Sequence, residues 1–175
     1  MDYIAFIAGL PEIAWDDRKL SLTVGEFREQ LKDYISGKDK NMMDLFFLPN
    51  DNAQVLRLLN RQGADPALQT VYPLKVLEDE VSEPDRNIPE YLRGFIADFK
   101  EEHLKYEVAP VNVLSWMYYD YMMKADNRLV REYAEYSMNL KNLVTAVNAR
   151  KYGMEVAKEV IGSNDFAVAL RTSNA

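Results

Sequence analysis

The 175-residue sequence contains no cysteine, which excludes disulfide bonds and thiolate metal sites and favours a reducing compartment. Glycine and proline are also scarce, with seven of each, so few residues break helices. There is one histidine, which leaves little material for histidine-based metal or acid–base chemistry. These absences favour a mostly helical protein that is not stabilised by metal ions or disulfide bonds.

Basic residues are outnumbered, 21 against 28 acidic ones, and the formal net charge is −7. This balance disfavours nucleic acid as a general partner, and it suits either solubility or docking to a basic protein face. No apolar run approaches the 18 residues that indicate a membrane-spanning helix. Any membrane contact is therefore expected to be indirect, through a partner protein.

Hydrophobic residues make up 48% of the chain, enough for a core, and the longest helical pattern runs from Asp126 to Gly153. We expect Asp126 to cap this helix of about 25 residues and Gly153 to end it. Its large apolar residues recur in alternating steps of four and three, which places them on one side of a helix. We expect that side to be buried and the helix to be the beam on which the others lean, so that Leu140→Ala costs about 2–5 kcal/mol. The six residues are Leu129, Tyr133, Tyr136, Leu140, Leu143 and Val147.

The rest of the chain predicts further helices, and the fold class is mostly α: a multi-helical bundle around the long central helix, forming a single domain of residues 1–175. Thr23 and Glu26 have the spacing of a capping box, which predicts a helix from there to about Ser36. The apolar run Tyr3–Ala8 fits either a short buried strand or the first turn of a helix. Further helices are expected at 39–47, from Asn50 or Asp51 to near residue 63, and at 91–104, 110–122 and 156–161, with one more turn at 166–170.

The stretch 63–90 differs, because it holds four of the seven prolines and, between residues 78 and 85, five acidic residues. It predicts a long acidic connection, with a short helical turn at 74–77, that is either an exposed linker or a binding segment. The polar ending RTSNA carries no signal of a finished fold, so the chain is expected to be the N-terminal part of a longer protein.

No motif of catalysis is found: there is no glycine-rich phosphate loop, no GxSxG and no HExxH. His103 and Glu107 lie one helical turn apart but supply too few ligands for a metal. The acidic run at 78–80 lacks the spacing of a calcium loop and fits a solvated surface. The sequence therefore predicts no catalytic, cofactor-binding or metal site, and a protein that is not an enzyme.

Two sets of side chains point instead to helix packing or protein contacts. The segment 116–123 carries aromatic and methionine residues on nearly all sides, so it is either a central helix or one that meets a partner. On the long helix, Asn139, Asn142 and Arg150 share one flank of the apolar stripe and Lys141 lies on the other. Amides are poor helix formers, so they predict specific hydrogen bonds, either between helices of this chain or to another chain.

The segments Asn139–Leu143 and Asn148–Gly153 resemble a helix of the C/d family of V-type ATPase subunits, over about a quarter of the chain. Residues 3–11 and 46–52 are similar to a bacterial family of uncharacterised proteins whose genes tend to lie in V-type ATPase operons. This second resemblance covers most of the chain.

The resemblance implies an all-helical part of a funnel that sits on the membrane rotor ring, receives the central stalk and couples rotation without doing chemistry. By that analogy the protein is cytoplasmic and peripheral to the membrane, has no cofactor, and has other V-type ATPase subunits as partners. Asn139, Lys141, Asn142 and Arg150 match the motif and would hold helices together. The alternatives are a stand-alone helical adaptor that binds through the segment 116–123, and an enzyme whose acid pair the sequence hides.

Overall fold

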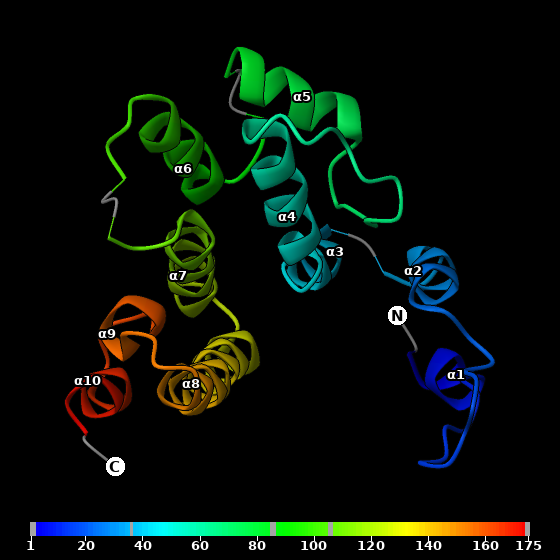
Figure 1. Ribbon diagram of the computed structural model, residues 1–175. Coiled ribbons are helices and arrows are strands. Elements are labelled where there is room, and N and C mark those ends of the chain that lie inside the picture. The colour runs from blue at the N-terminus through cyan, green and yellow to red at the C-terminus, as the bar shows by residue number, and fades with distance from the viewer. Residues whose placement is uncertain (1–2, 36, 85–86, 105–106, 174–175) are drawn as a thin grey trace. The chain divides into compact units, whose positions relative to one another are not determined.

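The computed structural model describes residues 3–35, 37–84, 87–104 and 107–173, and every regular element in these ranges is an α-helix (Figure 1). The expected mostly helical fold is confirmed. The first element, α1 (Tyr3–Ala8), is a helix and not a strand. Phe6 is buried, whereas Ile4 and Ile7 are largely exposed. The apolar composition of Tyr3–Ala8 therefore does not produce a buried strand.

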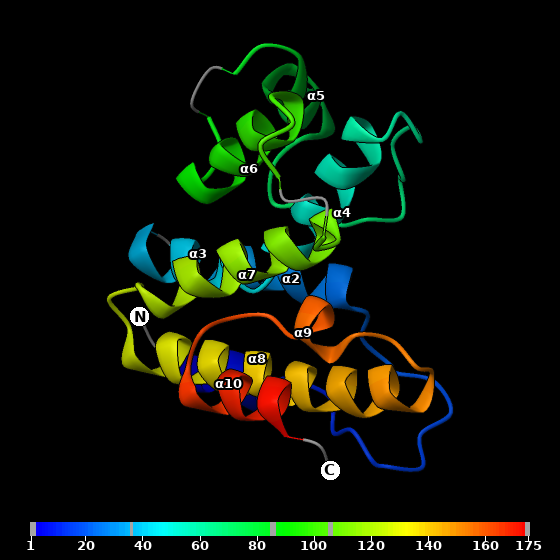
Figure 2. The ribbon, with the colours of Figure 1, turned by 60° about the vertical axis from the view of Figure 1, so that its left-hand side comes forward.

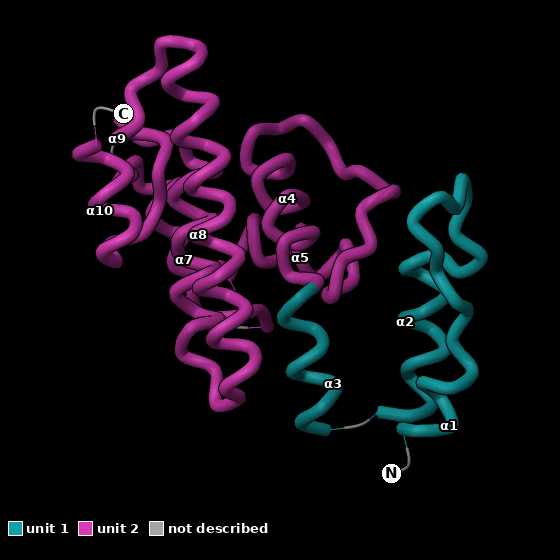
Figure 3. The backbone as a smooth tube through the Cα atoms, turned by 90° about the horizontal axis from the view of Figure 1, so that it is seen from below, with its two compact units in different colours: residues 1–46 teal, residues 47–175 magenta. Residues whose placement is uncertain are grey.

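The chain divides into two compact units, residues 1–46 and 47–175 (Figure 3). The first unit contains α1, α2 (Val24–Lys32) and α3 (Gly37–Asp44). The predicted capping box is present at the start of α2: the Thr23 hydroxyl accepts a hydrogen bond from the Glu26 amide at 3.2 Å, and the Thr23 amide donates to the Glu26 carboxylate at 2.8 Å. Phe6 packs against the rings of Phe27 and Tyr34, with centroids 5.8 and 4.7 Å away, and anchors α1 to α2.

The second unit is a run of helices in which each contacts its neighbours along the chain. α4 (Leu48–Leu59) contacts α5 (Leu74–Ser82), α6 (Glu90–Lys100) and α7 (Pro110–Met123). α7 and α8 (Arg128–Lys151) lie side by side and run in opposite directions, and α9 (Val156–Glu159) and α10 (Asp165–Thr172) pack on α8 (Figure 2).

α7 and α8 share the centre of the second unit, because each contacts three other helices of that unit. α7 contacts α4 and α6 as well as α8, and its Leu114, Tyr118 and Met122 are buried. The aromatic–methionine segment therefore packs mainly inside the protein. Burial raises the pKa of Tyr118, and Tyr119 and Tyr133 add to this effect. α8 is the longest described helix and is unbroken, as predicted, but it packs on the unit with only one of its sides.

The first part of the stretch 63–90 folds back onto α4 through buried polar contacts. Asp51 on α4 is fully buried, and its carboxylate accepts hydrogen bonds from the amides of Val71 at 2.9 Å and Tyr72 at 3.0 Å. The Asn50 side chain donates to the Gln69 carbonyl at 3.0 Å. The second part holds α5, which extends the predicted turn at 74–77 to nine residues. Residues 65–82 are therefore packed against α4, and the interpretation of a loosely attached linker is wrong for them.

Several helix boundaries differ from the predicted ones for local reasons. Pro49 lies in the first turn of α4, where the missing amide hydrogen of proline breaks no helical hydrogen bond. It therefore belongs to the start of α4 and does not mark the end of α3, which ends at Asp44. Asn127, one residue after the expected cap Asp126, caps α8 by accepting a hydrogen bond from the Val130 amide at 3.2 Å. α10 spans eight residues where a single turn was expected. Ser36, the expected end of the helix that starts after Thr23, lies outside the described residues, and α2 ends at Lys32.

Gly162, between α9 and α10, combines a positive φ of 84° with close neighbours. A Cβ at this position would lie 3.0 Å from Sδ of Met138 and 3.2 Å from Cζ3 of Trp116. We expect Gly162→Ala to lower the free energy of unfolding by about 2–4 kcal/mol, since left-handed strain and overpacking add. Gly153→Ala is the control: its φ is 68° but the space around it is open, so only about 1–2 kcal/mol is expected. Urea denaturation measures both, and equal losses would contradict the role of crowding.

Candidate functional site: the two faces of helix α8

α8 carries an apolar face on each of two opposite sides. At 100° per residue the two sets of side chains are centred about half a turn apart. The inner face is buried and made mostly of small residues, which let the neighbouring segments approach closely. Its members are Val130, Ala134, Met138, Asn142, Ala146 and Ala149.

Asn142 is the polar centre of the inner face and is only 1% exposed. Its Nδ2 donates to the carbonyl of Ile161 at 2.7 Å, and its Oδ1 accepts from the amide of the same residue at 2.9 Å. The side-chain amide thus pairs with both backbone polar groups of Ile161 in the extended segment between α9 and α10. Because that backbone is buried, these groups need such partners.

The other predicted site residues also make hydrogen bonds within the second unit. Asn139 accepts from Nδ2 of Asn164 at 3.0 Å, next to the start of α10. An Arg150 guanidinium nitrogen donates to the carbonyls of Leu170 and Ser173 at 2.9 and 3.0 Å. Three of the four predicted residues (Asn139, Asn142 and Arg150) therefore fasten the segment that follows α8 back onto α8.

Lys141 lies on the opposite flank, as the sequence indicated, and its Nζ is 3.0 Å from the Ser115 hydroxyl on α7. Desolvation lowers the pKa of this ammonium group. Lys141 thus contributes to the contact between α7 and α8, whereas the other three contribute to the contact with α9 and α10. The four residues do not converge on one site.

Arg171 belongs to the same fastening network and was not predicted. Its guanidinium donates to the carbonyls of Val160 at 2.8 Å and Gly162 at 2.6 Å, on either side of Ile161. The sequence holds no local signal for these bonds, since they depend on how the chain returns after Gly162.

The outer face of α8 is the stripe that the sequence predicted to be buried, and that prediction is wrong. All six residues are exposed, from 43% for Leu143 to 73% for Leu129, and Leu140 is 48% exposed. Val144 beside them is exposed as well. The physical reason is that α7, α9 and α10 pack on the small residues of the opposite side, which allow a closer approach.

The spacing of the outer stripe is typical of a contact between two helices. The stripe follows alternating steps of four and three without a third flanking position in each turn, which is the narrow seam of a coiled coil. A helix that faces a globular core has a wider stripe. From Leu129 to Val147 the stripe is roughly 27 Å long on a helix about 10 Å wide, so its area is on the order of 300 Å². Exposed apolar patches of this size are commonly contact sites.

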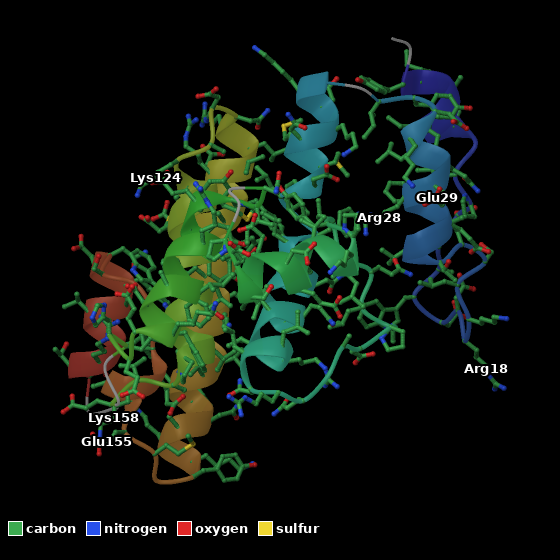
Figure 4. The ribbon with its side chains drawn as sticks, turned by 90° about the horizontal axis from the view of Figure 1, so that it is seen from above. Arg18, Arg28, Glu29, Lys124, Glu155 and Lys158 are labelled. Atoms are coloured by element: carbon green, nitrogen blue, oxygen red, sulfur yellow. The ribbon has the colours of Figure 1, made fainter. Side chains whose placement is uncertain are left out.

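Polar and charged groups elsewhere in the described residues form no recognisable reaction centre. No three His, Cys, Asp or Glu side chains in the described ranges come together as a metal site. His103 is exposed and lies 3.3 Å from the Glu101 carboxylate. A shallow hollow of about 250 Å³ in the first unit is lined partly by Phe6, Asp33 and Tyr34 and presents a single carboxylate. Charged pairs such as Lys158–Glu155, at 2.9 Å, stand on the surface of α9 (Figure 4).

These features define the class of the molecule: an all-helical protein whose longest described helix is buried on one side and apolar and exposed on the other. The chain belongs to the family described as "Protein of unknown function (DUF2764)", whose model matches residues 1–175. No curated protein and no solved structure matches it. Membership confirms that the family is an uncharacterised one, as the resemblance implied. The link to V-type ATPases stays a prediction.

Within the described part of the chain, none of the helices has the length together with the apolar character needed to cross a bilayer.

Proposed function

We propose that this protein is a non-catalytic interaction subunit that docks on a partner protein through the outer face of α8. The observation that carries the proposal is the exposed seam of Leu129, Tyr133, Tyr136, Leu140, Leu143 and Val147. Full burial of an exposed apolar side chain of this size contributes roughly 1.5–3 kcal/mol of favourable free energy. While these side chains face water, that contribution is not fully gained. A partner helix laid along the seam would recover part of that free energy.

The assembly that we propose is a V-type ATPase, with the protein as a subunit or accessory in contact with the central stalk and the rotor ring. The support is the resemblance of residues 3–11 and 46–52 to the uncharacterised family encoded beside V-type ATPase genes. The mechanical form of that analogy needs revision, because α8 is not a buried beam. In our proposal the outer face of α8 is a docking surface. The hydrogen bonds of Asn142 and Arg150 hold the segment after α8 against the inner face of the helix.

A tagged copy incubated with solubilised native membranes tests this proposal. Wild-type protein is expected to recover V-type ATPase subunits, and the variant Leu140→Glu/Leu143→Glu to recover at least about tenfold less, because two carboxylates would be buried in the contact. Val168→Glu is the matched control: Val168 is an exposed valine on α10, away from the seam, and the variant should behave as wild type.

Each other outcome has a defined meaning. Recovery of the ATPase by the double variant would exclude the outer face of α8 as the contact. Recovery of a soluble partner without any ATPase subunit would favour the stand-alone adaptor and exclude the ATPase assignment. The contact in that case would still be assigned to α8 if the double variant lost the partner.

A further inference from the structure

The outer seam of α8 is complementary to itself when a second copy runs in the opposite direction. Its steps of four and three read the same from both ends, with Met138 as the midpoint in sequence. In antiparallel coiled coils, residues of the two seam positions meet each other across the interface. The pairs set by this midpoint are Leu129 with Val147, Tyr133 with Leu143, and Tyr136 with Leu140.

The charges beside the seam favour the same direction. Asp126, one residue before the N-cap of α8, and Lys151, the last residue of α8, are exposed and are placed almost symmetrically about Met138 in the sequence. In an antiparallel pair each Asp126 faces the Lys151 of the second copy, so two such pairs form. In a parallel pair the two Asp126 residues would lie at one end and the two Lys151 residues at the other, so neither would meet the opposite charge. Antiparallel helices also place opposite dipole ends together.

The charges along α8 also favour the antiparallel direction. The N-terminal half carries Arg128, Arg131, Glu132 and Glu135, whose charges cancel, and the C-terminal half carries Lys141, Arg150 and Lys151, so an antiparallel pair keeps the two positive halves apart. No charged side chain interrupts the seam itself between Leu129 and Val147. α9 and α10 pack on the opposite side of the helix, which leaves the seam accessible along its length.

We propose that two copies of this protein associate through the outer faces of their α8 helices, antiparallel and centred near Met138. The inference rests on the proposed function only in taking this face as a helix-docking surface. It goes further by naming the occupant in the free protein: a second copy, which an assembly partner would have to displace.

The absence of cysteine makes the register directly testable in the full chain. Tyr136→Cys and Leu140→Cys are made as separate single variants, one of them with a tag that changes its size. Under mild oxidation, a mixture of the two is expected to give mainly the mixed disulfide dimer, because these positions face each other only in the antiparallel register. Each variant alone should cross-link much more slowly. Fast cross-linking of Tyr136→Cys with itself would contradict the antiparallel arrangement.

Sedimentation of the uncross-linked protein tests the association itself. At a concentration on the order of 100 μM a dimer is expected, and Leu143→Glu should be monomeric, while Val168→Glu should still dimerise. Lys151→Glu should weaken association about three- to tenfold at low salt, and Asp126→Lys/Lys151→Glu should restore it. A monomeric wild type, or a dimer that Leu143→Glu leaves intact, would overturn the proposal. Neither result would affect recovery of ATPase subunits in the pull-down, so the two proposals fail separately.

Discussion

Asn142→Ala is expected to lower the free energy of unfolding by about 2–4 kcal/mol, because it leaves both the amide and the carbonyl of Ile161 without their side-chain partner in a buried position. The expected damage is local, since the segment between α9 and α10 loses its fastening to α8. Urea denaturation measures the loss. Hydrogen exchange at the Ile161 amide should accelerate more than exchange at amides in α6.

Two further variants make this test specific. Asn148→Ala, on an exposed position of the same helix, should be neutral or slightly stabilising, because alanine has the better helix propensity. Asn142→Asp keeps the acceptor and loses the donor once it is ionised. Its carboxyl pKa is expected to rise in the folded state, above about 3.9 for the unfolded chain, because the protonated form can donate to the Ile161 carbonyl. Compared with wild type, the variant should therefore be least destabilised at low pH and should lose stability as pH rises through the folded pKa of this carboxyl group. An Asn142→Ala variant as stable as wild type would remove Asn142 from the account.

Asp51→Ala is the second substitution for which we expect a large effect, about 2–4 kcal/mol of unfolding free energy. The carboxylate is fully buried and accepts from two consecutive backbone amides, Val71 and Tyr72. Hydrogen bonds to a charged acceptor stabilise more than neutral ones, and their loss leaves two amides without this partner. Exchange of these two amides should accelerate in the variant.

Asp79→Ala is the matched control for Asp51→Ala. Its carboxylate forms an exposed pair with Lys75 at 2.6 Å, one helical turn away. Such pairs contribute only a few tenths of a kcal/mol. If Asp79→Ala lowered the free energy of unfolding as much as Asp51→Ala, the effect would come from removing any carboxylate and not from losing buried hydrogen bonds.

Local chemistry made part of the fold predictable. The capping box of Thr23 and Glu26 depends on residues within one helical turn, and the long α8 follows from apolar residues that recur with helical spacing; the structure agrees with both. Long-range polar contacts are different, because Asp51 meets amides 20 and 21 residues away. No spacing rule places Val71 and Tyr72 beside α4.

In the candidate site, too, local features follow from the sequence and long-range contacts do not. The flank shared by Asn139, Asn142 and Arg150 follows from helical geometry, and all three contact the segment after α8. The prediction of which side of α8 faces the core is wrong, because the large apolar residues lie on the exposed side and the small ones on the buried side. Ala134, Ala146 and Ala149 are buried, and the larger side chains of the outer stripe remain exposed. The choice between an inward and an outward seam depends on what α7, α9 and α10 present, and that is a property of the whole fold.

The unfolding free energy of Leu140→Glu, measured at a dilution at which copies do not associate, tests the two-faced account of α8 most directly. A glutamate on the exposed outer face should change it by less than about 1 kcal/mol. A loss above about 4 kcal/mol, as for a carboxylate forced into a core, would show that this face is covered within the chain, and would contradict its assignment as a docking surface.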